Sequence, residues 1–209
     1  MITVLTIDRE YGSGAVTIAQ KVAARLGWKL WDQALTDAIA RHMQCDKLHV
    51  ERHEERKDPL YYRMFKAFLR GSYEGSQRAP SMGIADAETI RQVSEKMVRA
   101  AAQEGNAVIV GRGSAYYLRD QPDALHVFIY APFEEKVRRL QSEGKTQEEA
   151  LELAESVDRD RAAFIMENFG VKFPTRTFFH VMVNSTIGED AAVQIILNSL
   201  AALGEPKPS

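Results

Sequence analysis

A short glycine turn near the start of the chain restricts the possible folds most strongly. Residues 1–17 read MITVLTIDREYGSGAVT, where the apolar run of residues 2–7 leads into the GSG turn at residues 12–14. A helical spacing of apolar residues follows directly, beginning with Ile18 and Val22. Glycine lets consecutive backbone N–H groups turn toward one point, and a helix N-terminus adds a partial positive charge. Strand, glycine turn and helix in this order therefore predict an anion site, with phosphate as the expected ligand.

The glycine turn matches a phosphate-binding loop only in part. That loop reads GxxxxGK[ST], where the lysine reaches the β- and γ-phosphates and the hydroxyl binds Mg²⁺. Gly14 supplies the second glycine, whereas Arg9 stands at the first glycine and Ala15 stands at the lysine. Thr17 can still place a hydroxyl near the helix start. A plain strand-to-helix turn is the alternative, and the flanking strand and helix favour the phosphate site.

Composition excludes several classes of function. The chain has 27 Lys and Arg against 29 Asp and Glu, so no overall charge attracts nucleic acid or an anionic membrane, and neither is expected as a partner. The single cysteine, Cys45, excludes an internal disulfide and fits a reducing compartment. The N-terminus lacks the basic segment of a signal peptide, and no apolar run approaches the roughly 20 residues of a membrane span. We therefore expect a cytoplasmic protein.

Strand and helix patterns alternate along the chain. The strand patterns are apolar along their whole length, which is typical of a parallel sheet covered by helices on both faces. We predict one three-layer α/β domain with a five-stranded parallel sheet over residues 1–203, followed by a disordered tail over 204–209. The expected strands are 2–7, 29–31, 107–110, 125–131 and 180–184, and the expected helices are 18–26, 33–57, 60–73, 86–103, 132–143, 146–168 and 189–203.

Charged residues stand directly after several predicted strands. Asp8 and Asp32 follow the first two, and Arg112 lies between Gly111 and Gly113 after the third. Ligands of parallel sheets bind beyond the carboxyl ends of the strands, so these residues are expected at one binding edge. An arginine held between two glycines there has little structural purpose of its own, and its fork of donors suits phosphate oxygens.

Several stretches resemble one known family. TIDREYGSGAVTIAQKVAARLGWKLWD is similar to the opening of the cytidylate kinase-like proteins, which run close to ISREYGSGGREIAKKLAEKLG before a Tyr-Asp pair. The later GRG, DRDRAAFIMENFG and FFHVMVNST resemble the central turn, lid and last strand of that family. The resemblance implies a P-loop nucleoside-monophosphate kinase fold with a helical acceptor-binding segment over 33–85 and a lid over 145–176. It implies transfer of the ATP γ-phosphoryl group, with Mg²⁺, to CMP or dCMP.

The same resemblance implies a role for individual residues. Arg159 and Arg161, in the lid, would act on the transferring group together with Arg9, whereas Asp32 and Arg112 would hold the acceptor. Asp8 and Thr17 would help to hold Mg²⁺. The ATP phosphates would lie on Gly12, Ser13, Gly14, Ala15, Val16 and Thr17. Arg159 and Arg161 are two residues apart, so on a helix only one of them is expected to face the site.

The chain departs from the family pattern at two places. Ala15 and Val16 replace a Gly-Arg pair, and His180 replaces an aspartate before the last strand. Arg9 or Lys21 could supply the missing cation, although ordinary solvated charge is the expected state of Lys21. A nucleotide-binding protein that has lost catalysis is therefore an alternative function, as is a kinase for another small acceptor.

Two further patterns have an ordinary structural explanation. His42, Cys45, His49 and His53 share one helical face, yet a straight helix offers only pairs of neighbouring ligands, so solvated histidines are expected rather than a metal site. The aromatic helix over 60–73 is expected to pack on the core, with base stacking or a homodimer contact as alternatives.

Overall fold

A five-stranded parallel sheet forms the centre of the protein. The computed structural model describes residues 1–32 and 87–204, and the structural statements below concern those residues. The strand order is β2-β3-β1-β4-β5, and every neighbouring pair is parallel. The predicted sheet is therefore confirmed. Its strands are β1 (Val4–Arg9), β2 (Lys29–Trp31), β3 (Ala107–Val110), β4 (Ala124–Tyr130) and β5 (Val181–Asn184).

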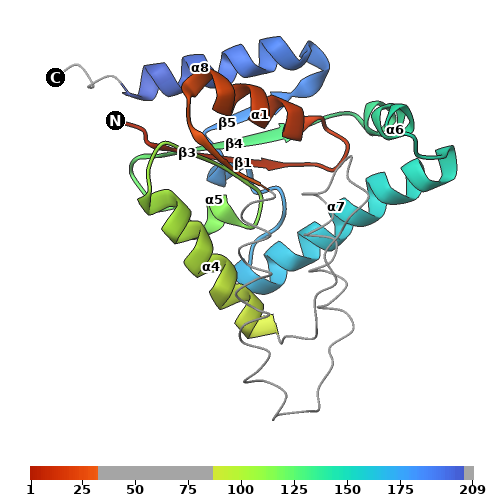
Figure 1. The fold of residues 1–209 in the computed structure, drawn as a ribbon. Coiled ribbons are helices and arrows are strands. Elements are labelled where there is room, and N and C mark those ends of the chain that lie inside the picture. Colours follow the sequence, from red (N-terminus) through yellow and green to blue (C-terminus); the bar gives the residue numbers. More distant parts are fainter. Residues whose placement is uncertain (33–86, 205–209) are drawn as a thin grey trace.

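Helices cover both faces of this sheet and give the expected three layers. In Figure 1, α1 and α8 lie on one face and α4 and α5 on the other, while α6 and α7 lie toward the carboxyl ends of the strands. The helices are α1 (Ala15–Leu26), α4 (Ala87–Gln103), α5 (Ser114–Tyr117), α6 (Phe133–Ser142), α7 (Gln147–Phe169) and α8 (Glu189–Gly204), with 3-10 turns η1 (Arg176–Phe178) and η2 (Ser185–Ile187). The sequence patterns did not predict the short helix α5.

Apolar side chains on both faces of each strand build two separate cores. Leu5 and Ile7 of β1 pack with α1 and α8, whereas Val4 packs on the opposite face with α4 and α5. This alternation explains why the strands are continuously apolar, because each face of a doubly covered sheet is buried. Helix α1 ends at Gly27, which adopts φ 65° and closes the last turn with its N–H group.

A third, smaller core lies under the glycine loop. The Tyr11 side chain is only 6% exposed and packs with Val137 and Leu140 of α6 and with Ala154 and Val157 of α7. Helix α7 begins with a capping box, in which Thr146 and Glu149 exchange side-chain and backbone hydrogen bonds. The loop therefore anchors the two helices that follow β4, and this contact brings α7 to the binding edge.

Some predictions lie outside the described residues. These are the acceptor-binding segment over 33–85, with its histidine and cysteine pattern and its aromatic helix, and the tail beyond Gly204. Among the helices of residues 1–32 and 87–204, none is long and apolar enough to cross a membrane.

Candidate active site

The glycine loop connects β1 to the N-terminus of α1. Gly12 and Gly14 both adopt φ 73°, the left-handed region that side chains other than glycine rarely enter. A Cβ atom on Gly12 would lie 3.1 Å from the Lys136 carbonyl oxygen, so both the backbone conformation and the tight packing favour glycine there. Gly14 caps α1 and carries no side-chain acceptor, which leaves the positive end of the helix facing the loop.

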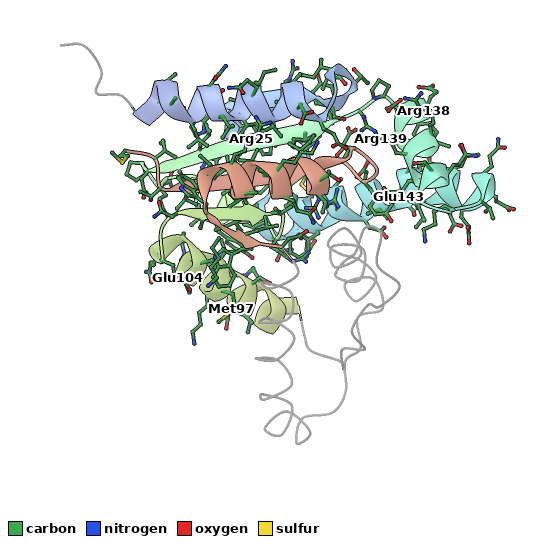
Figure 2. The ribbon with its side chains drawn as sticks, turned by 45° about the horizontal axis from the view of Figure 1, so that its top comes forward. Arg25, Met97, Glu104, Arg138, Arg139 and Glu143 are labelled. Atoms are coloured by element: carbon green, nitrogen blue, oxygen red, sulfur yellow. The ribbon has the colours of Figure 1, made fainter. Side chains whose placement is uncertain are left out.

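Helix α6 supports the loop through an arginine that the sequence did not single out. The Arg139 guanidinium donates to the Ser13 carbonyl oxygen and, from the same nitrogen, to Ser185 Oγ at 2.8 Å. Its other terminal nitrogen donates to the Ser185 carbonyl oxygen at 3.2 Å. Figure 2 shows Arg139 between α6 and the layer of α1 and α8. Arg139 therefore joins the glycine loop to the turn that follows β5.

A cluster of charged side chains supports the loop on its other side. Asp158 of α7 accepts the Tyr11 N–H at 2.8 Å and the Lys136 ammonium at 2.9 Å. Lys136 also lies 3.3 Å from Glu10 Oε2. Burial by itself lowers the pKa of Lys136, but attraction to and hydrogen bonding with Asp158 and Glu10 together raise it above the usual value. Lys136 and Asp158 were not among the predicted site residues.

Arg9 lies on the side of the site where the acceptor residues are expected. Its side chain is 3% exposed, and Nη2 is 4.0 Å from Oδ1 of Asp32, which directly follows β2. A Cβ atom on Gly111, after β3, would lie 2.6 Å from Arg9 Nη1. Glycine at position 111 therefore makes room for the Arg9 guanidinium, and the structure brings Arg9, Asp32 and the second glycine turn together.

Arg112 lies in the second glycine turn and has an unusual backbone conformation. It adopts φ 61° between two glycines that also have positive φ, and it is 1% exposed. A residue other than glycine costs free energy in this conformation, on the order of 1–3 kcal/mol, so such residues often mark functional sites. A Cβ atom on Gly113 would lie 3.0 Å from Phe169 Cζ, at the end of α7, so the turn packs closely against the last turn of that helix.

Asp8, near the carboxyl end of β1, is a fully buried carboxylate. Burial raises its pKa to about 6, although the positive charges of Arg161 and Arg9 act in the opposite direction. Within the described part of the chain, Asp8 Oδ2 accepts no hydrogen bond. Burial and the nearby Asp8 charge also raise the pKa of Tyr116 on α5. Asp8 is thus a carboxylate whose environment disfavours its charge, which is typical of functional acids and metal ligands.

Arg159 and Arg161 of α7 lie in different environments, as their spacing predicted. Arg161 is 5% exposed, donates to the Arg9 carbonyl oxygen, and lies 3.1 Å from Asp158 Oδ1. Arg159, two residues earlier on the same helix, is exposed. The structure therefore brings Arg161, but not Arg159, to the glycine loop.

The start of α1 carries neither the lysine nor the hydroxyl of the motif at their usual positions. Ala15, at the position of the missing lysine, is fully buried in the core, Val16 is half-buried, and Thr17 is exposed. In the GxxxxGK[ST] register the hydroxyl position is Val16, and Thr17 lies one residue beyond it. Lys21 forms ion pairs with Glu189 at 2.8 Å and Asp190 at 3.1 Å, at the start of α8.

His180 lies at the amino end of β5, away from the binding edge. Its Nδ1 accepts the His126 N–H at 2.9 Å, and the two rings stack with centroids 5.1 Å apart. The departure from the family pattern at position 180 therefore leaves the binding edge unchanged. No group of three or more His, Cys, Asp or Glu side chains that could hold a metal ion occurs in residues 1–32 and 87–204.

The sheet order and the glycine loop after β1 are those of the P-loop kinase fold, which solved shikimate kinases share. The chain belongs to the cytidylate kinase-like family, whose model matches residues 4–187. The resemblance noted in the sequence is thereby confirmed. No curated protein matches the sequence.

Solved structures share this fold at low sequence identity. An uncharacterized protein from Eubacterium ventriosum is 18% identical with a TM-score of 0.68, over 97% of this chain and 99% of that chain. TT1252 from Thermus thermophilus is 18% identical with a TM-score of 0.54, over 98% of this chain and 99% of that chain. A shikimate kinase from Acinetobacter baumannii, solved with shikimate, is 12% identical with a TM-score of 0.53, over 99% of this chain and 97% of that chain.

Proposed function

We propose that this protein transfers the γ-phosphoryl group of ATP to a nucleoside monophosphate, with CMP or dCMP as the acceptor. One observation carries the proposal: three buried arginines, Arg9, Arg112 and Arg161, lie at the carboxyl edge of the sheet beside the glycine loop. Guanidinium groups are rarely buried unless an anion is bound or paired there. Phosphoryl transfer depends mainly on positioning and on neutralising phosphate charge, which is what such groups supply.

The residues divide into an ATP side and an acceptor side. The loop over residues 12–17 would hold the ATP phosphates at the N-terminus of α1. Asp32 and Arg112 would hold the acceptor, and Arg9, which lies beside Asp32, belongs with them. Arg161, from α7, would face the transferring group. Arg159 would reach the site only if α7 rotated, because its side chain is exposed.

The site fits Mg²⁺ through one carboxylate. Asp8 is buried, carries an oxygen without a hydrogen-bond donor in the described residues, and has a raised pKa that a bound cation would lower. Mg²⁺ is usually held by one or two carboxylates together with substrate phosphates, so a single aspartate suffices. Bound Mg²⁺ would neutralise charge on the β- and γ-phosphates. The exposed Thr17 hydroxyl fits this role less well than Asp8.

A coupled ADP-release assay tests the proposal. Mg·ATP is offered with CMP, dCMP, UMP, AMP, GMP and shikimate, and turnover with CMP or dCMP above the rate of ATP hydrolysis is expected. Arg112→Ala should abolish use of the acceptor, and Gly14→Val should block ATP. Arg119→Ala is the matched control, since Arg119 is an exposed arginine close to the same turn. Equal activity of Arg112→Ala and the parent protein would remove Arg112 from the site.

A nucleotide-binding protein without catalysis is the second candidate, because Ala15 provides no lysine. Its signature would be a melting temperature that rises with ATP in the absence of turnover with any acceptor. The variant Ala15→Lys distinguishes the two functions further. A large gain in turnover from almost none would indicate that the protein has lost catalysis together with its lysine, and no gain would indicate that another cation replaces the lysine. Ala15 is fully buried, so the stability of this variant must be measured alongside its turnover.

A further inference from the structure

Asp158 of α7 joins three segments of the protein through one carboxylate. Its Oδ1 accepts the Tyr11 N–H of the glycine loop at 2.8 Å and Arg161 Nη1 at 3.1 Å. Its Oδ2 accepts the Lys136 ammonium of α6 at 2.9 Å. The Asp158 side chain is 19% exposed and that of Lys136 is 9% exposed, so these hydrogen bonds are formed largely out of water.

This carboxylate holds Arg161 in one orientation. Asp158 and Arg161 are three residues apart on α7 and therefore lie on the same face of the helix. The Arg161 guanidinium also donates to the Arg9 carbonyl oxygen at the end of β1, and its side chain is 6% exposed. Its positive charge lowers the pKa of Asp8, which places that charge near the proposed Mg²⁺ ligand. Two fixed acceptors and burial leave Arg161 little freedom to turn away.

The loop needs a cation from outside its own sequence. Position 15, where a phosphate-binding loop carries lysine, is a fully buried alanine. Lys21 is engaged with α8. Lys136 is held by two carboxylates, Asp158 at 2.9 Å and Glu10 at 3.3 Å, whereas the Arg161 guanidinium contacts the Asp158 carboxylate and also the backbone at the end of β1. Arg161 donates to the Arg9 carbonyl oxygen at the end of β1 and its charge acts on Asp8, so it places a positive charge beside the start of the glycine loop and the proposed Mg²⁺ ligand.

We propose that Asp158 is a positioning residue, which orients Arg161 so that its guanidinium provides the positive charge that Ala15 cannot. The inference rests on the proposed phosphoryl transfer. Asp158 acts through Arg161 and does not touch the substrate, while the hydrogen bond from Lys136 holds the Asp158 carboxylate in place. The hydrogen bond to Tyr11 ties this arrangement to the glycine loop, so that α7 and the loop form one unit.

A double-mutant cycle tests whether Asp158 acts through Arg161. Asp158→Ala should lower kcat about 100-fold, the scale expected when a catalytic group is misplaced by roughly 1 Å, with little change in the KM for ATP. Arg161→Ala should lose at least as much, and the double variant should be no worse than Arg161→Ala alone. Asp158→Glu should recover part of the activity. Asp160→Asn is the control, because Asp160 lies about 200° further round the same helix.

Two outcomes would overturn the proposal. If the double variant loses as much kcat as the two single variants combined, with the losses taken as free energies, Asp158 acts independently of Arg161. Tighter ATP binding by Asp158→Asn, about tenfold or more, would show that the carboxylate competes with phosphate for the loop. Asp158→Asn keeps the shape of the side chain, so it provides this comparison even if Asp158→Ala unfolds.

The positioning role of Asp158 can also be tested if the wild-type protein phosphorylates no acceptor. The same cycle is then measured as Mg·ATP affinity by calorimetry, together with the hydrogen-exchange rate of the Tyr11 amide. The proposal expects faster exchange at Tyr11 in Asp158→Ala and coupled, non-additive losses of affinity with Arg161→Ala. Unchanged exchange and additive affinities would refute the positioning role, whereas absent turnover alone would count only against the proposed function.

Discussion

Replacing Asp8 by asparagine is expected to stabilise the protein at neutral pH while it impairs phosphoryl transfer. Asp8 is fully buried, and burial raises its pKa from 3.8 to about 6 in spite of the opposing charges of Arg161 and Arg9. The folded state therefore binds the Asp8 proton more tightly than the unfolded chain does. The contribution of Asp8 to the free energy of unfolding is therefore fully present below pH 3.8 and is lost as the pH rises through about 6.

The magnitude follows from the size of this shift. Each pKa unit corresponds to about 1.4 kcal/mol, so ionised Asp8 costs the folded protein about 3 kcal/mol at neutral pH. Asparagine has nearly the same shape and does not ionise, so Asp8→Asn should recover about this amount. For a chain of this length, each kcal/mol moves the melting temperature by roughly 2–4 °C.

Urea unfolding of both proteins between about pH 3 and pH 8 measures the effect, because titrations that they share cancel in the difference. Asp8→Asn should match the parent near pH 3 and gain about 3 kcal/mol above pH 7. A variant less stable than the parent at neutral pH would refute the reasoning, since attraction to Arg161 and Arg9 would then outweigh desolvation. A loss of Mg·ATP-dependent turnover in the same variant would agree with a metal ligand at position 8.

Further predictions concern backbone conformation and acid stability. Gly111→Ala should destabilise the protein more than Gly27→Ala and should also impair activity, because both glycines have φ near 65° but only a Cβ on Gly111 meets Arg9, at 2.6 Å. Gly27→Ala isolates the backbone cost, about 1–2 kcal/mol by urea unfolding, and an equal loss in both variants would contradict the steric account. Burial and the neighbouring His180 lower the pKa of His126 from 6.5 to about 4, so the contribution of His126 to stability should fall by up to about 3 kcal/mol as the pH decreases between these values, opposite in sign to that of Asp8. His126→Asn should flatten that part of the profile, and an unchanged slope would assign the acid sensitivity to other groups.

Residues whose role depends on local chain geometry could be predicted from the sequence. The order of apolar runs, glycines and helical spacings predicted the five parallel strands and the glycine loop. Strands buried on both faces consist mainly of apolar residues, and a backbone with positive φ favours glycine, so both features can be seen in the sequence. Arg112 was singled out because an arginine between two glycines at the end of a strand has little structural purpose of its own. The spacing of Arg159 and Arg161 predicted that only one of them faces inward, but not which one, because that depends on how α7 is rotated against the loop.

Contacts between distant parts of the chain were not predictable in this way. Lys136, Arg139 and Asp158 support the glycine loop from helices more than a hundred residues away, and in the sequence they look like ordinary surface charges of amphipathic helices. The proximity of Arg9 to Asp32 was not predictable either, because Asp32 follows β2, which lies two strands away from β1 across the sheet.

By itself, the sequence determined the fold class and the glycine loop after the first strand, and it predicted that ligands bind at the carboxyl edge of the sheet. These properties follow from side-chain periodicity and from backbone conformations that only certain residues adopt. Only the tertiary structure decided which charged side chains meet at that edge and which of them contact the glycine loop. The reason is physical: burial, ion pairing and the orientation of a side chain arise from packing between helices and strands. Packing brings together residues that lie at irregular distances along the chain, so no sequence period reveals these contacts.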